Sequence, residues 1–246
     1  MQAVNVLCIK WGKEYGPEYV NKLHSMVSRN LKRPFRFVCL TDDAAGIDSS
    51  IEVKPIPAVG FDEFDQRKPW TFGHGWLKIT SFAKTLYDLQ GRTLFLDLDI
   101  VIVDSLDVFF EQSGEFVVIK EWDKRDGTGN TSCYLFTIGA HADAIEHLKN
   151  GYPQSIADVR NEQEFITGYL GRQGKVSYWP DAWCRSFKRH CMRRGIMGWF
   201  AQPVIPPGAR IIVFHGKPNP PDVIAGVSGK WYRRVLPAQW VTDNWR

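Results

Sequence analysis

Residues 92–103, which read RTLFLDLDIVIV, are almost entirely apolar and rich in β-branched side chains. This composition predicts a strand buried on both faces, of the kind found in the centre of an α/β sheet. Two carboxylates interrupt it, Asp97 and Asp99, and the two-residue period of a strand puts both on the same face. Paired like charges in an apolar strand are costly unless something compensates them. A hard divalent metal at the carboxyl end of this strand is the simplest compensation.

The rest of the chain alternates between strand and helix patterns. Apolar runs at 4–9, 35–40 and 51–56 predict strands, and a helix beginning at Pro17 separates the first two, which is βαβ patterning typical of a parallel sheet. After an irregular segment at 57–75, we expect helices at about 75–89, 141–149 and 162–171, a helical turn at 105–110, strands at 116–120, 130–136, 176–179 and 210–214, and an irregular stretch at 181–208. We expect one α/β domain over residues 1–222 and a C-terminal extension over 223–246.

Composition narrows the class of protein. The 246 residues are 44% hydrophobic and 24% charged, as in an ordinary globular protein, and residues 1–10 predict a first strand rather than a signal peptide. There are five cysteines, an odd number without a C-x-x-C motif. They are expected to be reduced core thiols in a cytoplasmic protein rather than zinc ligands.

The positive charge is concentrated at the C-terminal end. From Asp181 onward there are 11 Lys and Arg against three Asp, and half of the ten tryptophans lie there. This basic and aromatic tail is equally compatible with contact to an anionic membrane or phosphorylated ligand and with a solvated basic face over core tryptophans. It contains no recognised nucleic-acid-binding module, so a nucleic-acid partner is not expected.

Polar side chains follow several of the predicted strands. In open α/β sheets, ligands bind outside the carboxyl ends of the strands, and those ends meet at one edge. We therefore expect the following side chains to converge: Lys10, Asp42, Asp97, Asp99, Glu121 and His215.

Five motifs, in order along the chain, resemble those of GT-A glycosyltransferases of family 8, and the likeness is closest to bacterial family-8-like proteins. LFLDLD at 94–99 resembles their D-x-D motif, and FHGKP at 214–218 resembles their H-G…K-P signature. NTSCYLF at 130–136 is similar to their N-S-G-V-x-x-F strand, EQE at 162–164 falls where they carry D-Q, and WLK at 76–78 resembles a helix whose Lys faces the donor. The resemblance runs from the first strand to about Asp222.

This resemblance implies a GT-A, Rossmann-like fold with a mostly parallel central sheet flanked by helices. It implies transfer of a hexose-type sugar from a nucleotide diphosphate donor, expected to be UDP-linked, to an acceptor hydroxyl with retention of configuration. A glycan or glycolipid acceptor fits the tail, which would pack on the domain or face the acceptor or the inner surface of the cell membrane.

The resemblance also assigns residues. Asp97, Asp99 and His215 would hold Mn²⁺ or Mg²⁺, and carboxylate and imidazole ligands suit those ions. The expected donor site comprises Lys10, Trp11, Tyr15, Asp42, Lys78, Leu98, Asn130 and Lys217, with Tyr15 stacking on the base and the two later lysines on the phosphates. The expected catalytic or sugar-contacting residues are Glu121, Asp123, Glu162 and Gln163. The chain departs from the family where Glu162 replaces Asp and Ser132 replaces Gly.

Structural interpretations stand beside these assignments. Trp11 and Tyr15 would simply pack the start of the helix, Asp42 or Asp43 would cap a turn, and His215 would cap a strand end. Asn161, with Glu164 three residues on, is a helix N-cap with a capping-box-like partner.

Two other functions compete with glycosyl transfer. Residues 97–101 also fit the D-x-D-x-[TV] motif of haloacid-dehalogenase-type phosphatases, with Asp97 as nucleophile. That interpretation needs a later acidic pair and gives no role to residues 215–218. A non-catalytic sugar-nucleotide-binding protein is the second alternative, and the intact Asp97, Asp99 and His215 argue against it.

Overall fold

The computed structural model describes residues 3–59, 75–151, 154–193, 195, 199–228 and 234–246. Most of the predicted irregular segment 57–75 lies outside these residues. The strands are β1 (Val4–Lys10), β2 (Phe35–Thr41), β3 (Glu52–Pro55), β4 (Arg92–Leu96), β5 (Ile100–Ile102), β6 (Phe116–Lys120), β7 (Gly129–Thr137), β8 (Val176–Tyr178), β9 (Cys184–Ser186) and β10 (Ile211–Val213). The α-helices are α1 (Pro17–Asn30), α3 (Ala142–Gly151), α4 (Glu162–Arg172), α5 (Pro220–Ile224) and α6 (Gln239–Asn244), and the short helical turns are η2 (Trp76–Phe82), η3 (Asp107–Glu111), η4 (Gln154–Ile156) and η5 (Phe187–Cys191).

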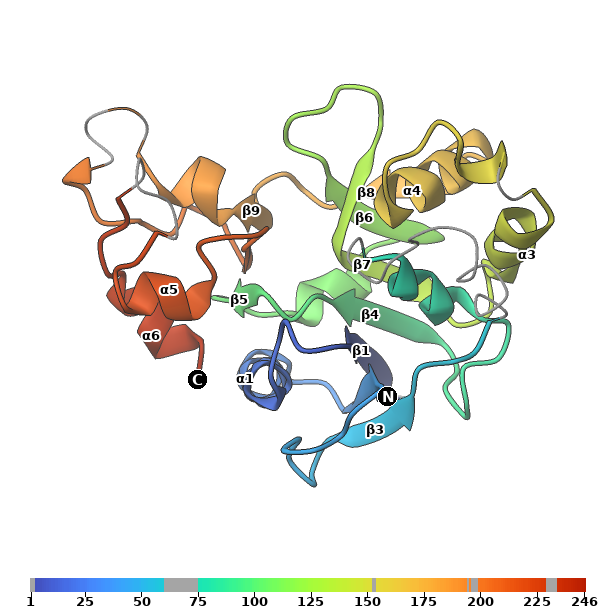
Figure 1. The fold of residues 1–246 in the computed structure, drawn as a ribbon, viewed down its shortest axis with the longest axis horizontal. Helices are drawn as coiled ribbons and strands as arrows, with labels where there is room; N and C mark the ends of the chain where they lie inside the picture. The colour runs from blue at the N-terminus through green and yellow to red at the C-terminus, as the bar shows by residue number, and fades with distance from the viewer. Residues whose placement is uncertain (1–2, 60–74, 152–153, 194, 196–198, 229–233) are drawn as a thin grey trace.

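Seven strands form the central sheet in the order β3-β2-β1-β4-β7-β6-β8 (Figure 1). β1 runs parallel to both β2 and β4, and β7 is antiparallel to its two neighbours, β4 and β6. Because β7 is antiparallel to both β4 and β6, the strands β6 and β8 point in the same direction as β1, β2 and β4. The predicted mostly parallel sheet is confirmed, and the carboxyl ends of these five strands share one edge.

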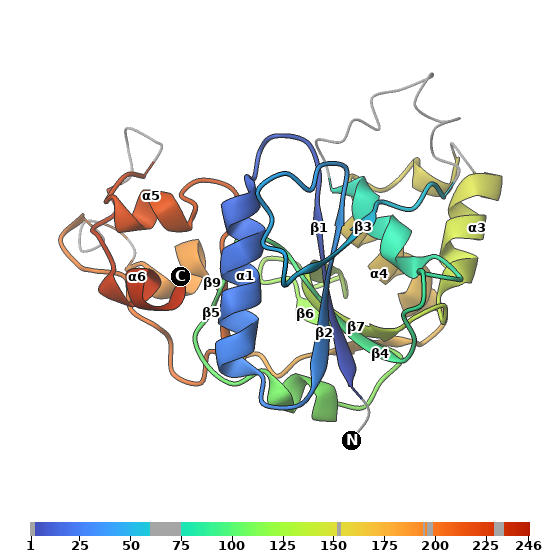
Figure 2. The ribbon, with the colours of Figure 1, turned by 90° about the horizontal axis from the view of Figure 1, so that it is seen from below.

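Helices cover both faces of this sheet. On one face, Val20, Leu23 and Val27 of α1 are fully buried against alternate residues of β1, β2 and β4. On the other face, η2, α3 and α4 pack against the intervening residues. Figure 2 shows α1 on one side of the sheet and α3 on the other. Because side chains alternate along each strand, the strands contribute residues to two hydrophobic cores, one on each face.

A second, three-stranded sheet has the order β5-β10-β9. The prediction of one continuous strand over 92–103 is wrong, because β4 belongs to the large sheet and β5 to the small one. The break falls at the two aspartates: the backbone N–H of Asp97 still donates to Ser132 of β7, whereas the carbonyl of Asp99 accepts from Phe214, next to β10. If the large sheet continued past Leu96, both carboxylates would be buried between hydrogen-bonded strands, which is energetically costly. The sheet ends before this happens.

Two other predicted elements differ from the structure. The helix expected at 75–89 is the single 3₁₀ segment η2, and its chain turns extended at Ala83. The hydroxyls of Thr80 and Ser81 donate to carbonyls three residues earlier, a bonding pattern that competes with a continuous α-helix. Residues 181–208, expected to be irregular, contain β9 and the one-turn π-helix η5.

The described part of the C-terminal extension lies beside α1 and the small sheet, at the orange-to-red side of Figure 1. Trp245 is 5% exposed, and its ring contacts Tyr19 of α1 edge-on at 5.2 Å, with the ammonium of Lys22 4.5 Å above it. All five cysteines are buried and unpaired, as predicted for core thiols. In the described part of the chain, no helix combines the length and apolarity needed to cross a bilayer.

Candidate active site

A cavity of about 170 Å³ opens at the carboxyl edge of β1 and β4. It gathers six residues that the sequence predicted for one site: Trp11, Tyr15, Lys78, Asp97, Leu98 and Asp99. They come from the β1–α1 turn, from η2 and from the segment between the two sheets. The break in the predicted strand therefore does not separate the two aspartates, which line the same cavity.

Lys78 joins two carboxylates from different elements. Its Nζ lies 2.7 Å from Oδ1 of Asp97 and 3.7 Å from Oε1 of Glu162, the first residue of α4. Burial lowers the pKa of Lys78, but the charges of Asp97 and Glu162 outweigh it and raise that pKa overall. Glu162 also accepts from the Thr131 hydroxyl, and burial raises its pKa despite Lys78. Glu162, predicted to lie near the reacting sugar, is thus in this charged cluster.

Asp99 is held by Tyr15, whose hydroxyl donates to its Oδ2 at 3.1 Å. Burial, followed by the nearby charge of Asp97, raises the pKa of Asp99 to about 7. Burial and Asp99 also raise the pKa of Tyr15, so its hydroxyl stays a donor. Tyr15 packs on Tyr19 at 4.8 Å between ring centroids, which supports the packing interpretation without removing the ring from the cavity.

The carboxylate pair fits a hard divalent cation. Asp97 and Asp99 are close enough for one charge to raise the pKa of the other, and a bound cation would relieve that repulsion. The predicted third ligand, His215, is not assembled with them. Within the described ranges, no three His, Cys, Asp or Glu side chains form a group that could hold a metal.

His215 instead contacts β9 and the β6–β7 loop. Its Nε2 lies 2.6 Å from Oγ of Ser186 in β9, and its ring stacks on Trp122 at 5.7 Å. Burial, and then the cations Lys188 and Arg189, lower the pKa of His215 to about 4. The imidazole is therefore neutral at pH 7, the form that binds metals.

Four predicted donor-site residues do not line this cavity: Lys10, Asp42, Lys217 and Asn130. Lys10 is buried and donates to the carbonyl of Asp43 at 3.3 Å. Asp42 is exposed and accepts from the Gly12 backbone at 2.9 Å, whereas Asp43 caps the local turn by accepting from the Ala45 backbone at 2.9 Å. Lys217 is exposed and lies 3.1 Å from Asp222.

The remaining predicted residues lie along the β6–β7 loop, at the start of β7 and on α4. Asn130 is buried and donates to Glu121 at 3.3 Å, and Asp123 forms an ion pair with Arg189 of η5. Gln163 is half-buried in the first turn of α4.

The helix-cap interpretation of Asn161 is borne out, since its side chain accepts from the Glu164 backbone at 3.1 Å. Among the described residues, the Glu164 side chain does not complete a capping box with the Asn161 backbone. The Glu164 carboxylate accepts from the backbone of Arg160, one residue before the cap.

Sequence reasoning missed three residues that hold the predicted ones. Ser186 bonds His215, Trp122 stacks on it, and Thr131 bonds Glu162. Trp122 follows Glu121 directly, so its place after a strand was a usable signal. Ser186 lies in a three-residue strand too short to show a period, and nothing local marks it.

Comparisons with models of protein families and with curated protein sequences find no match. Among solved structures, the chain is similar to the galactosyltransferase LgtC in complex with donor and acceptor sugar analogs, with a TM-score of 0.62 and 14% identity over 88% of each chain. A Gln-to-Glu active-site mutant of LgtC gives a TM-score of 0.60 and 14% identity, covering 88% of this chain and 89% of that one. The chain therefore has the GT-A fold of LgtC.

Proposed function

We propose that this protein is a metal-dependent glycosyltransferase that moves a hexose-type sugar from a nucleotide diphosphate donor, expected to be UDP-linked, to an acceptor hydroxyl. One observation carries the proposal. A single cavity at the carboxyl edge of the sheet holds two aromatic rings, Trp11 and Tyr15, beside Lys78 and the Asp97–Asp99 pair. Rings, a cation and paired carboxylates are the groups needed for a base, a diphosphate and a metal. The fold shared with LgtC supports this direction.

In this proposal, Asp97 and Asp99 hold Mn²⁺ or Mg²⁺, with His215 as a third ligand once it leaves Ser186. When bound, the cation supplies Lewis-acid stabilisation of the departing diphosphate. Lys78 is half-buried beside Asp97 and provides a fixed positive charge at the same place. Lys217 is exposed on the H-G-K-P segment and can turn toward a phosphate.

We assign binding of the donor sugar to the charged cluster of Lys78, Asp97 and Glu162. Glu162 is held rigidly by Lys78 and Thr131, so its carboxylate is positioned to accept a hydrogen bond from a donor-sugar hydroxyl. Glu121, Asp123 and Gln163 are proposed to contact donor or acceptor hydroxyls. We infer retention of configuration, with a donor phosphate oxygen taking the acceptor's proton on the same face of the sugar. Product anomericity measured by NMR tests this inference.

We further propose a glycan or glycolipid acceptor, a cytoplasmic location and peripheral contact of the basic tail with the inner membrane surface. Trp199 and Phe200 support that contact, since they are 47% and 72% exposed. Apolar side chains exposed on a basic segment are typical of membrane-surface binding.

The experiment is a panel of UDP- and GDP-sugars, assayed for binding and slow hydrolysis with Mn²⁺ or with EDTA. Metal-dependent binding of one donor, lost in Asp99→Ala and in His215→Ala, is the expected result. A phosphate trapped covalently on Asp97 would instead support the phosphatase alternative. Binding of a sugar nucleotide with no turnover under any condition would favour a non-catalytic protein.

A further inference from the structure

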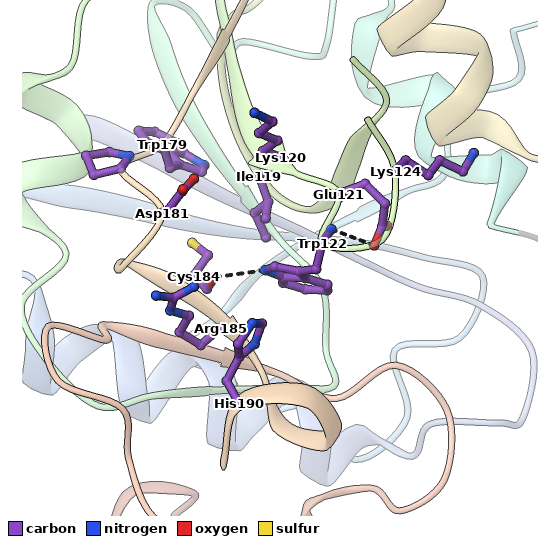
Figure 3. A pocket seen from close by; sticks show the side chains of 11 residues that line it. Ile119, Lys120, Glu121, Trp122, Lys124, Trp179, Asp181, Cys184, Arg185 and His190 are labelled. Atoms are coloured by element: carbon purple, nitrogen blue, oxygen red, sulfur yellow. Dashed lines mark hydrogen bonds between the residues drawn. The ribbon is translucent and has the colours of Figure 1, made fainter. Parts of the chain in front are cut away.

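A second cavity, of about 240 Å³, lies between the carboxyl end of β6 and the β9–η5 segment (Figure 3). In Figure 3, Arg185 and His190 lie below the indole of Trp122, while Trp179 and Asp181 lie above it. Of the residues that line it, Glu121 alone belongs to the predicted site.

Of the cations that line this cavity, Lys120 and Arg185 form no ion pair with a described carboxylate, and the more buried of the two is Arg185. It stands between Cys184 and Ser186 on β9, and because those two side chains are buried, strand alternation turns Arg185 to the opposite face. Its Nε is buried and has no hydrogen-bond partner in the described part of the chain, and no described carboxylate forms an ion pair with it. Lys124, on the same cavity, is already paired with Glu164 at 2.5 Å.

An unpaired buried guanidinium nitrogen is costly, and an anionic ligand removes that cost. The planar fork of arginine matches a carboxylate or a phosphate with two parallel hydrogen bonds. The charge at Arg185 therefore selects for a ligand that carries an acidic group.

The other walls select for a sugar. The Trp122 indole is fixed in place, since its Nε1 donates to the Cys184 carbonyl at 3.3 Å. A rigid aromatic face beside the carboxylates of Glu121 and Asp181 offers an apolar surface together with acceptors for hydroxyl groups. Two carboxylates would repel a simple inorganic anion. A hydroxyl-rich ring with one acidic substituent can instead bind the guanidinium, the aromatic face and the carboxylates together.

Short hydrogen-bonded steps connect this cavity to the Asp97–Asp99 site. The Asn130 side chain donates to Glu121 and accepts from the Ser132 backbone, and the Ser132 carbonyl accepts from the Asp97 backbone. A sugar bound against Glu121 therefore sits next to the proposed donor site. This is the relation that an acceptor needs.

We propose that this cavity binds the acceptor of the reaction, and that the acceptor sugar carries a carboxylate or phosphate group bound by Arg185. The assignment as acceptor rests on the proposed glycosyltransferase function. The binding site itself rests on the cavity and on the unpaired guanidinium.

The test compares matched ligands that differ in one group, without donor or metal. Methyl glycosides of glucose and galactose are paired with the corresponding uronic acids and 6-phosphates, and dissociation constants are measured by NMR titration. We expect at least one acidic glycoside to bind about tenfold or more tightly than its neutral partner, because hydrogen bonds to charged groups contribute about 1.5–3 kcal/mol. The preferred acidic series tells carboxylate from phosphate recognition.

Arg185→Gln should abolish that preference, whereas Arg185→Lys should keep part of it. Arg172→Gln, on α4 and away from this cavity, is the matched control and should leave the preference unchanged. Equal binding of neutral and acidic glycosides, an unaltered preference in Arg185→Gln with native circular dichroism, or no binding of any acidic ligand would overturn the proposal. The outcome is separable from the proposed function: Arg185-dependent binding without transfer would refute the transferase alone, and transfer to neutral acceptors insensitive to Arg185 would refute this site alone.

Discussion

The ammonium of Lys78 lies 2.7 Å from a carboxylate oxygen of Asp97, so the candidate metal site of the free protein already contains a cation. The two side chains are only 12% and 16% exposed, and Glu162 lies on the other side of Lys78 at 3.7 Å. Without a bound ion, Lys78 is the positive charge that offsets the repulsion among the carboxylates of Asp97, Asp99 and Glu162. A bound metal ion and the ammonium of Lys78 therefore both reduce the electrostatic repulsion among these carboxylates.

The first prediction is that Lys78→Met destabilises the metal-free protein by about 3–5 kcal/mol, because removing one partner of a buried pair leaves an uncompensated charge. Mn²⁺ should then raise the melting temperature of the variant more than that of the wild type. Thermal melts with Mn²⁺ and with EDTA measure both effects, and Lys84→Met, on the exposed chain after η2, is the control. A variant as stable as the wild type in EDTA would contradict the shared-charge interpretation.

The second prediction separates two roles of Tyr15. Tyr15→Phe keeps the ring but removes the hydrogen bond to Asp99, so metal affinity in the presence of UDP should fall about tenfold, as expected for a hydrogen bond to a charged group. Tyr15→Leu also removes the ring and should weaken metal-free UDP binding as well. Calorimetric titration of both variants with UDP and Mn²⁺ gives the two effects. If Tyr15→Phe behaves as wild type, stacking or packing alone explains this residue.

The third prediction concerns the competition for His215. Its Nε2 is engaged by the Ser186 hydroxyl at 2.6 Å, so binding a metal through this atom requires that hydrogen bond to break. Ser186→Ala should therefore tighten metal-dependent donor binding several-fold, because a net contribution of about 0.5–1.5 kcal/mol no longer opposes it. His215→Ala should abolish the same binding. Unchanged donor affinity in both variants would remove His215 from the metal site.

The sequence predicted which strands end at the functional edge, because apolar runs followed by polar residues are a local pattern. That pattern predicted that Lys10, Asp42, Asp97, Asp99, Glu121 and His215 converge, and of these six Asp97 and Asp99 line the cavity. Tyr15 and Lys78, which line it too, were assigned by the resemblance to family 8. The pattern could not show that the chain changes sheets between Leu96 and Ile100, since both halves have the same composition.

Contacts between segments that are distant in the sequence could not be predicted, for a different reason. Ser186 and His215 are 29 residues apart, and their meeting depends on the pairing of β9 with β10. A three-residue strand carries too little periodicity to predict that pairing. The same argument explains why Arg185 could be recognised as basic but not as a lining residue of a cavity.

The fourth prediction follows from Glu164. Burial raises its pKa, but hydrogen bonds from Arg160 and Lys124 outweigh burial and lower that pKa to about 2. A carboxyl group whose pKa is lower in the folded than in the unfolded state contributes its full stabilisation at pH values above the unfolded-state pKa. That contribution is lost as the pH falls through the folded-state pKa. Glu164→Gln should thus be about 1–2 kcal/mol less stable at pH 7, with the difference vanishing between about pH 4.5 and pH 2.

Urea unfolding of the wild type and Glu164→Gln across this pH range measures the Glu164 contribution. Glu146→Gln is the matched control, because Glu146 is 63% exposed and its distance to Lys149 is 4.0 Å. A stability difference that stays constant down to pH 2 would show that the Glu164 charge is not its cause.

The fifth prediction tests whether residues 223–246 are part of the folded domain. Trp245 is buried against Tyr19 and Lys22 of α1, and Val241 of α6 is fully buried in the same core. Trp245→Ala should therefore lower the free energy of unfolding by about 3–5 kcal/mol, while Trp245→Phe should cost less because it keeps a ring on Tyr19. Chemical denaturation followed by circular dichroism gives both values. Near-wild-type stability of Trp245→Ala, together with rapid proteolysis before residue 239, would instead show that the extension is a separate segment available to an acceptor or a membrane.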